Sequence, residues 1–332
     1  MELKPREVIT LLKGAPAARE QVGRVVPDRF TDLQRTGYPY GGAQYTRTYC
    51  HASVTLDFYT DATALSFSYG NLWNETNDTG PCSFDLLLDG VLTKRYHLPV
   101  DWTVQRAPDG QLRMALGAGE KRVTLHLTNF FHVELFDVVL EDATFARPYE
   151  HRGRFLAFGD SITEGFFSRT PSQTYVNRLS RLLDMEAVNY AIGGEKCRPG
   201  VVTPGTYPDC DFVIVAYGTN DFPHTAPERF KENLPAFHAR LHEAFPDVPV
   251  FILLPLWRKI ADKEKPLGTL RDVSAMIAAS AKNYPNFRVV NCVGFLPHEA
   301  WTLLDGSLHP NDEGMALYAE RLADVIRKEL HI

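Results

Sequence analysis

The chain has 332 residues, of which 44% are hydrophobic, enough to form one large domain or two ordinary ones with packed cores. Its formal net charge of -6 lacks the basic surplus that a general binder of nucleic acid or of anionic membranes needs to neutralise phosphates. We therefore expect no nucleic-acid partner and no membrane partner, and a neutral or modestly polar ligand.

The N-terminal twenty residues are charged from the start and contain only one short apolar stretch, residues 8–12. This stretch is too short for the core of a signal peptide or for a membrane span, so we expect a cytoplasmic protein. Two Asn-x-Thr acceptor patterns for N-linked sugars, 74–76 and 77–79, would have no consequence in that compartment.

The five cysteines are odd in number, scattered and free of any C-x-x-C pair. Neither a disulfide framework nor a zinc knuckle is indicated, and we expect reduced, mostly buried thiols.

From about Val26 to Phe145 the sequence alternates apolar and polar residues in short segments. These segments are 53–59, 64–70, 83–90, 94–100, 121–129 and 132–142. Turn residues lie between them, including Asp89-Gly90 and Asp109-Gly110, as expected for antiparallel strands at hairpin spacing. No long helix-period stretch interrupts them. The pattern predicts an antiparallel β-sandwich, jelly-roll-like or immunoglobulin-like.

After Arg147-Pro148 the pattern changes to apolar runs separated by amphipathic stretches. The runs are 154–159, 187–191, 212–218, 248–255 and 287–294, and the amphipathic stretches are 172–183, 226–245, 267–283 and 312–330. Alternating strands and helices predict an α/β fold, a parallel sheet covered by helices on both faces. We therefore expect two domains, 1–148 and 149–332. In such sheets ligands bind beyond the carboxyl ends of the strands.

Ser161, in the segment FGDSITEG (158–165), follows the first predicted parallel strand by one turn. A serine hydroxyl is a poor nucleophile unless a base removes its proton, so a histidine is needed nearby. His309 precedes the last predicted helix and is the best candidate, while His224, after the third strand, is its competitor. Asp312 is expected to cap the last helix.

An acyl-transfer reaction at Ser161 also needs two or three fixed donors for the oxyanion. Three groups at strand ends could supply them: the amide of Ser161, the amide of Gly194 and the side-chain amide of Asn220. Gly193 could replace Gly194. This chemistry requires no metal and no cofactor, and the sequence contains no ligand cluster or phosphate-binding loop.

Four blocks of the C-terminal half, about residues 153–332, resemble the SGNH or GDSL-type serine hydrolases. The blocks are Gly159-Asp160-Ser161-Ile162, Asn189 to Gly194, Gly218-Thr219-Asn220-Asp221, and Asp305 with His309-Pro310. The resemblance implies a flavodoxin-like sheet, the serine as nucleophile, the histidine as base and an oxyanion hole from the three donors above.

One block departs from the family pattern. The aspartate usually precedes the histidine by three residues, but Gly306 occupies that position and Asp305 lies four residues before His309. Asp305 can orient the imidazole if the loop bulges. Otherwise a backbone carbonyl would take its place, leaving a serine-histidine dyad.

A β-sandwich preceding this kind of hydrolase resembles the arrangement of some carbohydrate acetyl esterases. The resemblance implies a small-molecule or oligosaccharide ester as substrate, with acetyl groups removed from sugars. The family also includes arylesterases, lysophospholipases and thioesterases. From a different class, a non-catalytic carbohydrate-binding protein is the rival hypothesis, and a homo-oligomer is compatible with the sequence.

Two tryptophans are candidate substrate-binding residues. Trp257, after the fourth predicted parallel strand, could line the acyl or alcohol pocket, or pack under a domain interface. Trp73 could form a sugar platform, or pack within the protein.

Overall fold

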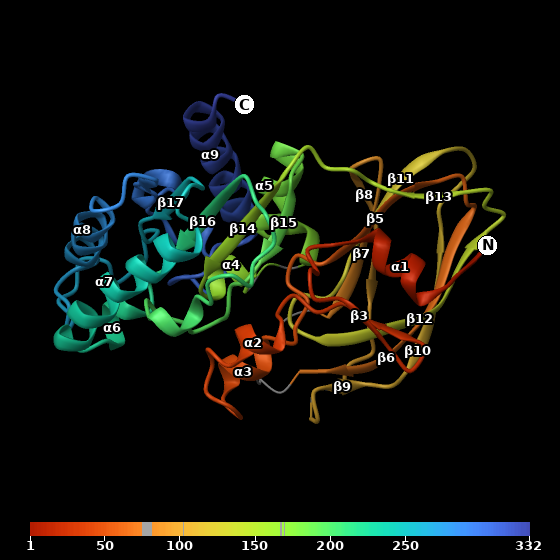
Figure 1. Ribbon diagram of the computed structural model, residues 1–332, viewed down its shortest axis with the longest axis horizontal. Coiled ribbons are helices and arrows are strands. Elements are labelled where there is room, and N and C mark those ends of the chain that lie inside the picture. The colour runs from red at the N-terminus through yellow and green to blue at the C-terminus, as the bar shows by residue number, and fades with distance from the viewer. Residues whose placement is uncertain (75–81, 102, 167, 169) are drawn as a thin grey trace. The chain divides into compact units, whose positions relative to one another are not determined.

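The computed structural model describes residues 1–332 except 75–81, 102, 167 and 169 (Figure 1). The acceptor pattern at 77–79 and residues 75–76 of the pattern at 74–76 lie outside the described residues. Contacts divide the chain into two compact units. Unit 1 contains Met1–Phe30, Thr46–Arg152 and Thr170–Ser172, and unit 2 contains Thr31–Tyr45, Gly153–Arg169 and Gln173–Ile332.

These units differ from the expected ranges 1–148 and 149–332 mainly in the segment Thr31–Tyr45, which groups with unit 2. Hydrogen bonds hold this segment: the side-chain amide of Gln34 donates to the carbonyl and the hydroxyl of Thr206, at 3.2 and 3.1 Å. The sequence did not indicate that segment 31–45 belongs to unit 2, because a compact unit is defined by contacts between residues that can be distant in sequence.

Unit 1 contains two antiparallel sheets. The first has strand order β10-β6-β12-β4-β3, with β1 beside β12 and β9 beside β6. Its strands are β1 (Glu2–Leu3), β3 (Arg19–Gln21), β4 (Arg24–Val26), β6 (Ala64–Trp73), β9 (Arg106–Ala107), β10 (Gly110–Ala115) and β12 (His132–Glu141). The second has order β13-β5-β11-β7-β8, with β2 beside β5. Its strands are β2 (Leu12–Lys13), β5 (Thr55–Thr60), β7 (Ser83–Leu88), β8 (Val91–His97), β11 (Lys121–His126) and β13 (Ala146–Pro148).

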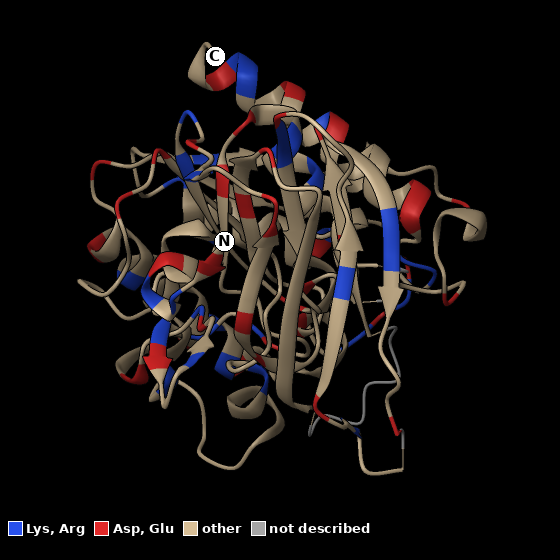
Figure 2. Cartoon of the chain, turned by 90° about the vertical axis from the view of Figure 1, so that its right-hand side faces the viewer, with Lys and Arg blue, Asp and Glu red and all other residues tan. Residues whose placement is uncertain are grey.

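The six alternating segments of the N-terminal half thus form strands of antiparallel sheets, whereas the jelly-roll connection stays a prediction. In each of β5, β7 and β11, five of the six residues are buried. Phe67 of β6 packs edge-on against Phe84 of β7, with ring centroids 5.6 Å apart. This contact joins the two sheets through an apolar core. In Figure 2, the strands that face the viewer are mostly uncharged, with a few acidic and basic positions.

The two aspartate-glycine pairs behave differently. Asp89 and Gly90, with φ of 49° and 80°, form the tight turn between β7 and β8, as their residue types predict. Asp109-Gly110 was expected at a hairpin turn, and this prediction is wrong. Both β9 and β10 pair with β6, so the pair interrupts one edge strand, where the Asp109 carboxylate accepts a hydrogen bond from the Asn71 amide at 3.1 Å.

Unit 2 contains a five-stranded parallel sheet of order β15-β14-β16-β17-β18. Its strands are β14 (Arg154–Gly159), β15 (Glu186–Asn189), β16 (Phe212–Ala216), β17 (Val250–Leu253) and β18 (Phe287–Val290). Each of the five apolar runs supplies one strand, and the central strands β14, β16 and β17 are almost fully buried, as expected for a parallel sheet covered on both faces. Numbered along the chain the order is 2-1-3-4-5, which is the flavodoxin-like arrangement.

Helices cover both faces of this sheet (Figure 1). The main ones are α5 (Tyr175–Leu183), α7 (Pro227–Ala244), α8 (Leu270–Ala281) and α9 (Asp312–Leu330). Helices α5 and α9 pack together against one face, in a core that includes Tyr175, Met315 and Tyr318. Shorter helices are α1 (Pro5–Leu11), α2 (Asp32–Arg35), α3 (Ala43–Arg47), α4 (Ser161–Glu164) and α6 (Asp221–His224), with 3-10 turns at Pro171–Gln173, Pro199–Val201, Val293–Phe295 and Ala300–Thr302.

The N-terminus of α9 differs from the expectation. Asn311 is the capping residue, because its side chain accepts a hydrogen bond from the Gly314 amide at 2.9 Å. Asp312 is instead the first residue of the helix, where its negative charge interacts favourably with the positive end of the helix dipole.

All five cysteines are free thiols, and all except Cys210 are buried. Among the described residues, no helix has both the length and the apolar character needed to cross a membrane.

Candidate active site

Ser161 lies at the junction between β14 and α4. Asp160 caps the helix, since its carboxylate accepts a hydrogen bond from the Ile162 amide at 3.0 Å, and Gly165 ends it after one turn with φ of 100°. The serine is therefore the first residue of a helix that starts directly beyond the carboxyl end of a buried strand. Only 8% of its surface is exposed.

The Ser161 hydroxyl is paired with His309. Its Oγ lies 2.9 Å from the Nε2 of His309, a hydrogen-bonding distance for proton transfer between nucleophile and base. His224, the competing candidate, is exposed at the end of α6, and its backbone carbonyl accepts a hydrogen bond from the Lys196 ammonium group at 3.2 Å. The geometry thus brings Ser161 together with His309.

Asp305 lies on the other side of the imidazole, with its Oδ2 2.7 Å from His309 Nδ1. Its second oxygen, Oδ1, accepts hydrogen bonds from the backbone amides of Ser307, Leu308 and His309, at 2.8, 2.7 and 3.2 Å. The extra residue in this block is accommodated by that turn. Gly306 adopts a φ of 62°, a left-handed conformation that glycine takes at little cost.

The hydrogen bonds keep Asp305 ionised. Burial by itself would raise the pKa of this carboxyl, but the bonds from the Leu308 amide and the His309 ring outweigh it, and the net pKa lies below the ordinary value of 3.8. An ionised carboxylate at Nδ1 holds the ring in the tautomer whose Nε2 can accept a proton.

Arg258 is a buried cation that the sequence reasoning missed. Its Nη1 donates to the Thr219 carbonyl at 3.0 Å. Burial lowers its pKa, while the negative charges of Asp160 and Asp305 raise it, so the guanidinium lies within the electrostatic reach of both. An arginine remains charged in such a setting and favours the ionised form of Asp305. Only its position after Trp257 in a strand-end loop could have drawn attention to it.

The predicted oxyanion donors are arranged as follows. The amides of Ser161 and Gly194 have no hydrogen-bond partner among the described residues. The amide of Gly193 is engaged, because it donates to the Glu164 carboxylate at 2.6 Å, which leaves Gly194 as the donor of this pair. Asn220 donates from Nδ2 to the Glu195 carbonyl at 3.0 Å, which uses one of its two amide hydrogens and fixes the orientation of the other.

Two carboxyls are buried near these donors. Burial raises the pKa of Asp160 to about 7, with a further contribution from the charge of Asp221. Burial also raises the pKa of Asp221, although its two oxygens accept hydrogen bonds from the Cys197 amide and the Thr225 hydroxyl, each at 3.0 Å. The Asp160 carboxyl is therefore partly protonated at neutral pH.

The two tryptophans make ring contacts within their own units. Trp257 is half-buried and stacks on the His298 ring, with centroids 5.2 Å apart. Trp73, also half-buried, stacks on His132 at 5.1 Å and contacts the Tyr49 ring. Their roles in substrate binding stay predictions.

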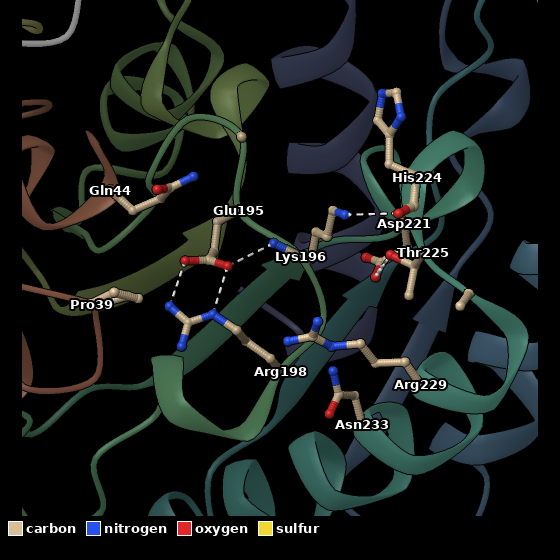
Figure 3. Close-up of a pocket in the computed structure, with 12 residues that line it drawn as sticks. Pro39, Gln44, Glu195, Lys196, Arg198, Asp221, His224, Thr225, Arg229 and Asn233 are labelled. Atoms are coloured by element: carbon tan, nitrogen blue, oxygen red, sulfur yellow. Dashed lines mark hydrogen bonds and ion pairs between the residues drawn. The ribbon is translucent and has the colours of Figure 1, made fainter. Parts of the chain in front are cut away.

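A pocket of about 410 Å³ opens beside Gly194 (Figure 3). Gln44 lines it, and its Nε2 lies so near Gly194 that a Cβ built on that glycine would be 3.5 Å away. No sequence signal indicated Gln44, because it belongs to the N-terminal half and only the tertiary structure brings it here. Among the described residues, no group of three or more histidines, cysteines or carboxylates is arranged to hold a metal ion.

Residues 157–317 match the model of the GDSL-like lipase/acylhydrolase family. This range includes the paired Ser161 and His309 and all the expected oxyanion donors. Residues 157–317 therefore form a domain of the GDSL-like lipase/acylhydrolase family. No curated protein sequence matches the chain significantly.

Solved structures with similar folds extend over most of the chain. One is SsfX3, a salicylyl-acyltransferase from a tetracycline biosynthetic pathway, with a TM-score of 0.81 and 21% identity over 96% of this chain and 94% of that one. A putative GDSL-like lipase from Bacteroides ovatus has a TM-score of 0.78 and 20% identity, covering 100% and 98%. A family two carbohydrate esterase from Clostridium thermocellum, in complex with cellohexaose, has a TM-score of 0.60 and 18% identity, covering 85% and 94%. At these identities the likeness concerns the fold.

Proposed function

We propose that this protein is a serine esterase that removes short acyl groups, above all acetyl, from a carbohydrate or oligosaccharide. The single observation that carries the catalytic part is the continuous chain of hydrogen bonds from Ser161 Oγ through the His309 ring to Asp305. Family membership supports an ester hydrolase.

The reaction would proceed through an acyl-enzyme. Ser161 Oγ attacks the ester carbonyl carbon, and its proton moves to His309 Nε2, while Asp305 stabilises the imidazolium from the other side. The carbonyl oxygen becomes an oxyanion that accepts hydrogen bonds from the donors on Ser161, Gly194 and Asn220.

Collapse of the tetrahedral intermediate breaks the bond to the alcohol oxygen. That oxygen takes the proton from His309 and leaves as the free hydroxyl. A water molecule then gives a proton to His309 and attacks the acyl carbon. The bond from that carbon to Ser161 Oγ breaks, Oγ takes the proton back from His309, and the carboxylic acid leaves.

Two considerations support a carbohydrate acetyl ester. The solved structures with this fold include several family two carbohydrate esterases and an acetyl xylan esterase from Butyrivibrio proteoclasticus. Unit 1 is an antiparallel β structure that precedes the hydrolase fold in this chain, as expected for a two-domain esterase.

A second candidate is acyl transfer to an alcohol. The similarity to the acyltransferase SsfX3 covers 96% of this chain, compared with 85% for the carbohydrate esterase from Clostridium thermocellum. Both reactions share the acyl-enzyme and differ only in whether water or an alcohol attacks it.

The first experiment compares the protein with its Ser161→Ala variant on 4-nitrophenyl acetate. We expect the variant to fold normally and to lose 10³-fold or more in turnover, on the order that removing a nucleophile costs. A fluorophosphonate probe should label the protein but not the variant. Retained activity in the variant would identify another nucleophile, and an unlabelled protein would favour the carbohydrate-binding alternative.

A second experiment addresses the substrate. Acetyl, butyryl and longer aryl esters are compared beside an acetylated xyloside, with and without a sugar alcohol as acceptor. Preference for the acetyl ester with turnover of the xyloside supports the proposal, and preference for long chains contradicts it. Formation of a new ester with the added alcohol at the expense of hydrolysis would favour the acyltransferase.

A further inference from the structure

The pocket beside Gly194, which we name the Arg229 pocket, borders the candidate oxyanion hole. Gly194 lines one side of it, and Asp221, the residue directly after Asn220, lines another. Two of the three segments that carry the expected oxyanion donors therefore form its wall. A group held in this pocket would belong to a substrate whose ester carbonyl lies at Ser161.

The acidic side chains of the Arg229 pocket are already satisfied. Glu195 is buried and forms a two-point ion pair with Arg198, with oxygen to nitrogen distances of 2.8 and 2.7 Å. Asp221 accepts hydrogen bonds from the Cys197 amide and the Thr225 hydroxyl. Figure 3 shows the ion pair between Glu195 and Arg198.

The basic side chains outnumber them. Lys196, Arg198 and Arg229 line the pocket beside the two carboxylates. Lys196 donates to the backbone carbonyl of His224, and its charge lowers the pKa of Asp221 in part compensation for burial. The guanidinium of Arg229, in the first turn of α7, has no ion pair or hydrogen bond among the described residues.

Neutral hydrogen-bonding groups complete the pocket. Gln44 and Asn233 both line it, and their side-chain amides can donate and accept hydrogen bonds. The segment carrying Gln44 is held to unit 2, because Arg198 Nη1 donates to the Gly37 carbonyl at 2.7 Å. The same arginine therefore neutralises Glu195 and anchors the segment that brings Gln44 to the pocket.

We propose that the Arg229 pocket is a subsite for a carboxylate carried by the ester substrate, with Arg229 as its principal partner and Lys196 and Gln44 as additional donors. A guanidinium matches a carboxylate in shape and charge, and its hydrogen bonds to such a group are stronger than those between neutral groups. This inference rests on the proposed esterase function and specifies its substrate class. The carboxylate could belong to the alcohol, as in an acetylated acidic sugar, or to the acyl group, as in the half-ester of a dicarboxylic acid.

The test uses the full-length protein and three esters: an acetylated methyl glucuronide, an acetylated methyl glucoside and a succinylated methyl glucoside. We expect kcat/KM to be about tenfold or more higher for one of the charged esters than for the neutral one, mainly through KM, as one charge-assisted hydrogen bond allows. Preference for the glucuronide assigns the carboxylate to the alcohol, and preference for the succinyl ester assigns it to the acyl group.

Substitution tests whether the pocket causes this preference. In Arg229→Gln the ratio of kcat/KM between the preferred charged ester and the neutral ester should fall to near one. Lys231→Gln is the matched control: Lys231 lies on the same helix, is exposed and does not line the pocket, so that variant should keep the ratio. Equal turnover of the three esters, or a preference that survives Arg229→Gln, would overturn the proposal.

Direct binding separates this inference from the proposed function. Glucuronate and succinate are titrated calorimetrically into Ser161→Ala, with methyl glucoside as the neutral reference. If Ser161→Ala binds one of the two anions and the added Arg229→Gln substitution abolishes that binding, the subsite is supported even when no ester is hydrolysed. Hydrolysis of the neutral ester without binding of either anion would retain the esterase and refute the carboxylate subsite.

Discussion

The replacement Asp305→Asn isolates the contribution of the carboxylate to catalysis. In the protein, Oδ1 of Asp305 accepts three backbone amides and Oδ2 faces His309 Nδ1. An asparagine side chain has one oxygen and one amide nitrogen. Because the three backbone donors require the oxygen at the Oδ1 position, the nitrogen is placed against the imidazole.

This placement reverses the hydrogen bond. The asparagine amide would donate to Nδ1, so the proton of the neutral imidazole would sit on Nε2, the atom 2.9 Å from Ser161 Oγ. The ring could then no longer accept the serine proton. The wrong tautomer in a serine triad costs about 10⁴-fold in turnover, so we expect a loss of about 10³ to 10⁴-fold here, or roughly 4 to 5.5 kcal/mol of transition-state stabilisation.

The assay is kcat/KM for 4-nitrophenyl acetate, with circular dichroism and thermal unfolding to verify the fold. Asp324→Asn is the control, since Asp324 is an exposed aspartate on α9, and its activity should stay within about twofold of the unchanged protein. A loss below tenfold in a folded Asp305→Asn variant would refute the argument. It would show that the site works as a serine-histidine dyad, with His309 oriented by another group.

Three further predictions concern the oxyanion hole, a buried carboxyl group and the segment 31–45. Asn220→Ala should reduce kcat by about 10² to 10³-fold with a smaller change in KM, because it removes an oxyanion donor; equal kcat values would exclude Asn220 from the hole. Burial raises the pKa of Asp160 to about 7 from 3.8, so between these pH values the folded state retains a proton that the unfolded chain releases, and the free energy of unfolding should fall as pH rises. In urea titrations the Asp160→Asn variant should show a smaller fall, and an unchanged slope would contradict the assignment. A Cβ on Gly37 would lie 2.0 Å from the Gly200 carbonyl oxygen, so Gly37→Ala should lower the free energy of unfolding by about 1 to 3 kcal/mol. A Cβ on Gly294 would lie in open space, so the control Gly294→Ala should change this free energy by less than about 0.5 kcal/mol. Similar values for the two variants would show that segment 31–45 is not packed as described.

The hydrolase fold was predictable because its signals are local. Each apolar run of the C-terminal half became one strand of the parallel sheet, and β14 has the expected bounds of 154–159. The sites at the strand ends follow from the fold, because parallel strands present all their carboxyl ends at one edge. Sequence order alone therefore predicted that Ser161, Gly194 and Asn220 would lie in neighbouring loops.

The sequence favoured His309 over His224, because His309 precedes the last predicted helix and belongs to one of the four family blocks. Only the structure shows its contact with Ser161. The role of Asp305 was left open by the sequence, since an extra residue can either displace a carboxylate or be absorbed in a turn. Three backbone amides gathered on one oxygen, together with the left-handed Gly306, resolve this spacing into a contact with His309.

By itself the sequence determined the two kinds of sheet and the strands of the parallel sheet, because these depend on periodicity. It also determined which residues can attack, accept a proton or donate hydrogen bonds, because this depends on residue chemistry. Tertiary structure decided which histidine meets the serine, that Gly193 is occupied by Glu164, and that segment 31–45 brings Gln44 beside Gly194. These contacts join residues up to about 150 positions apart, and their energies arise only when the packed chain holds both partners at once.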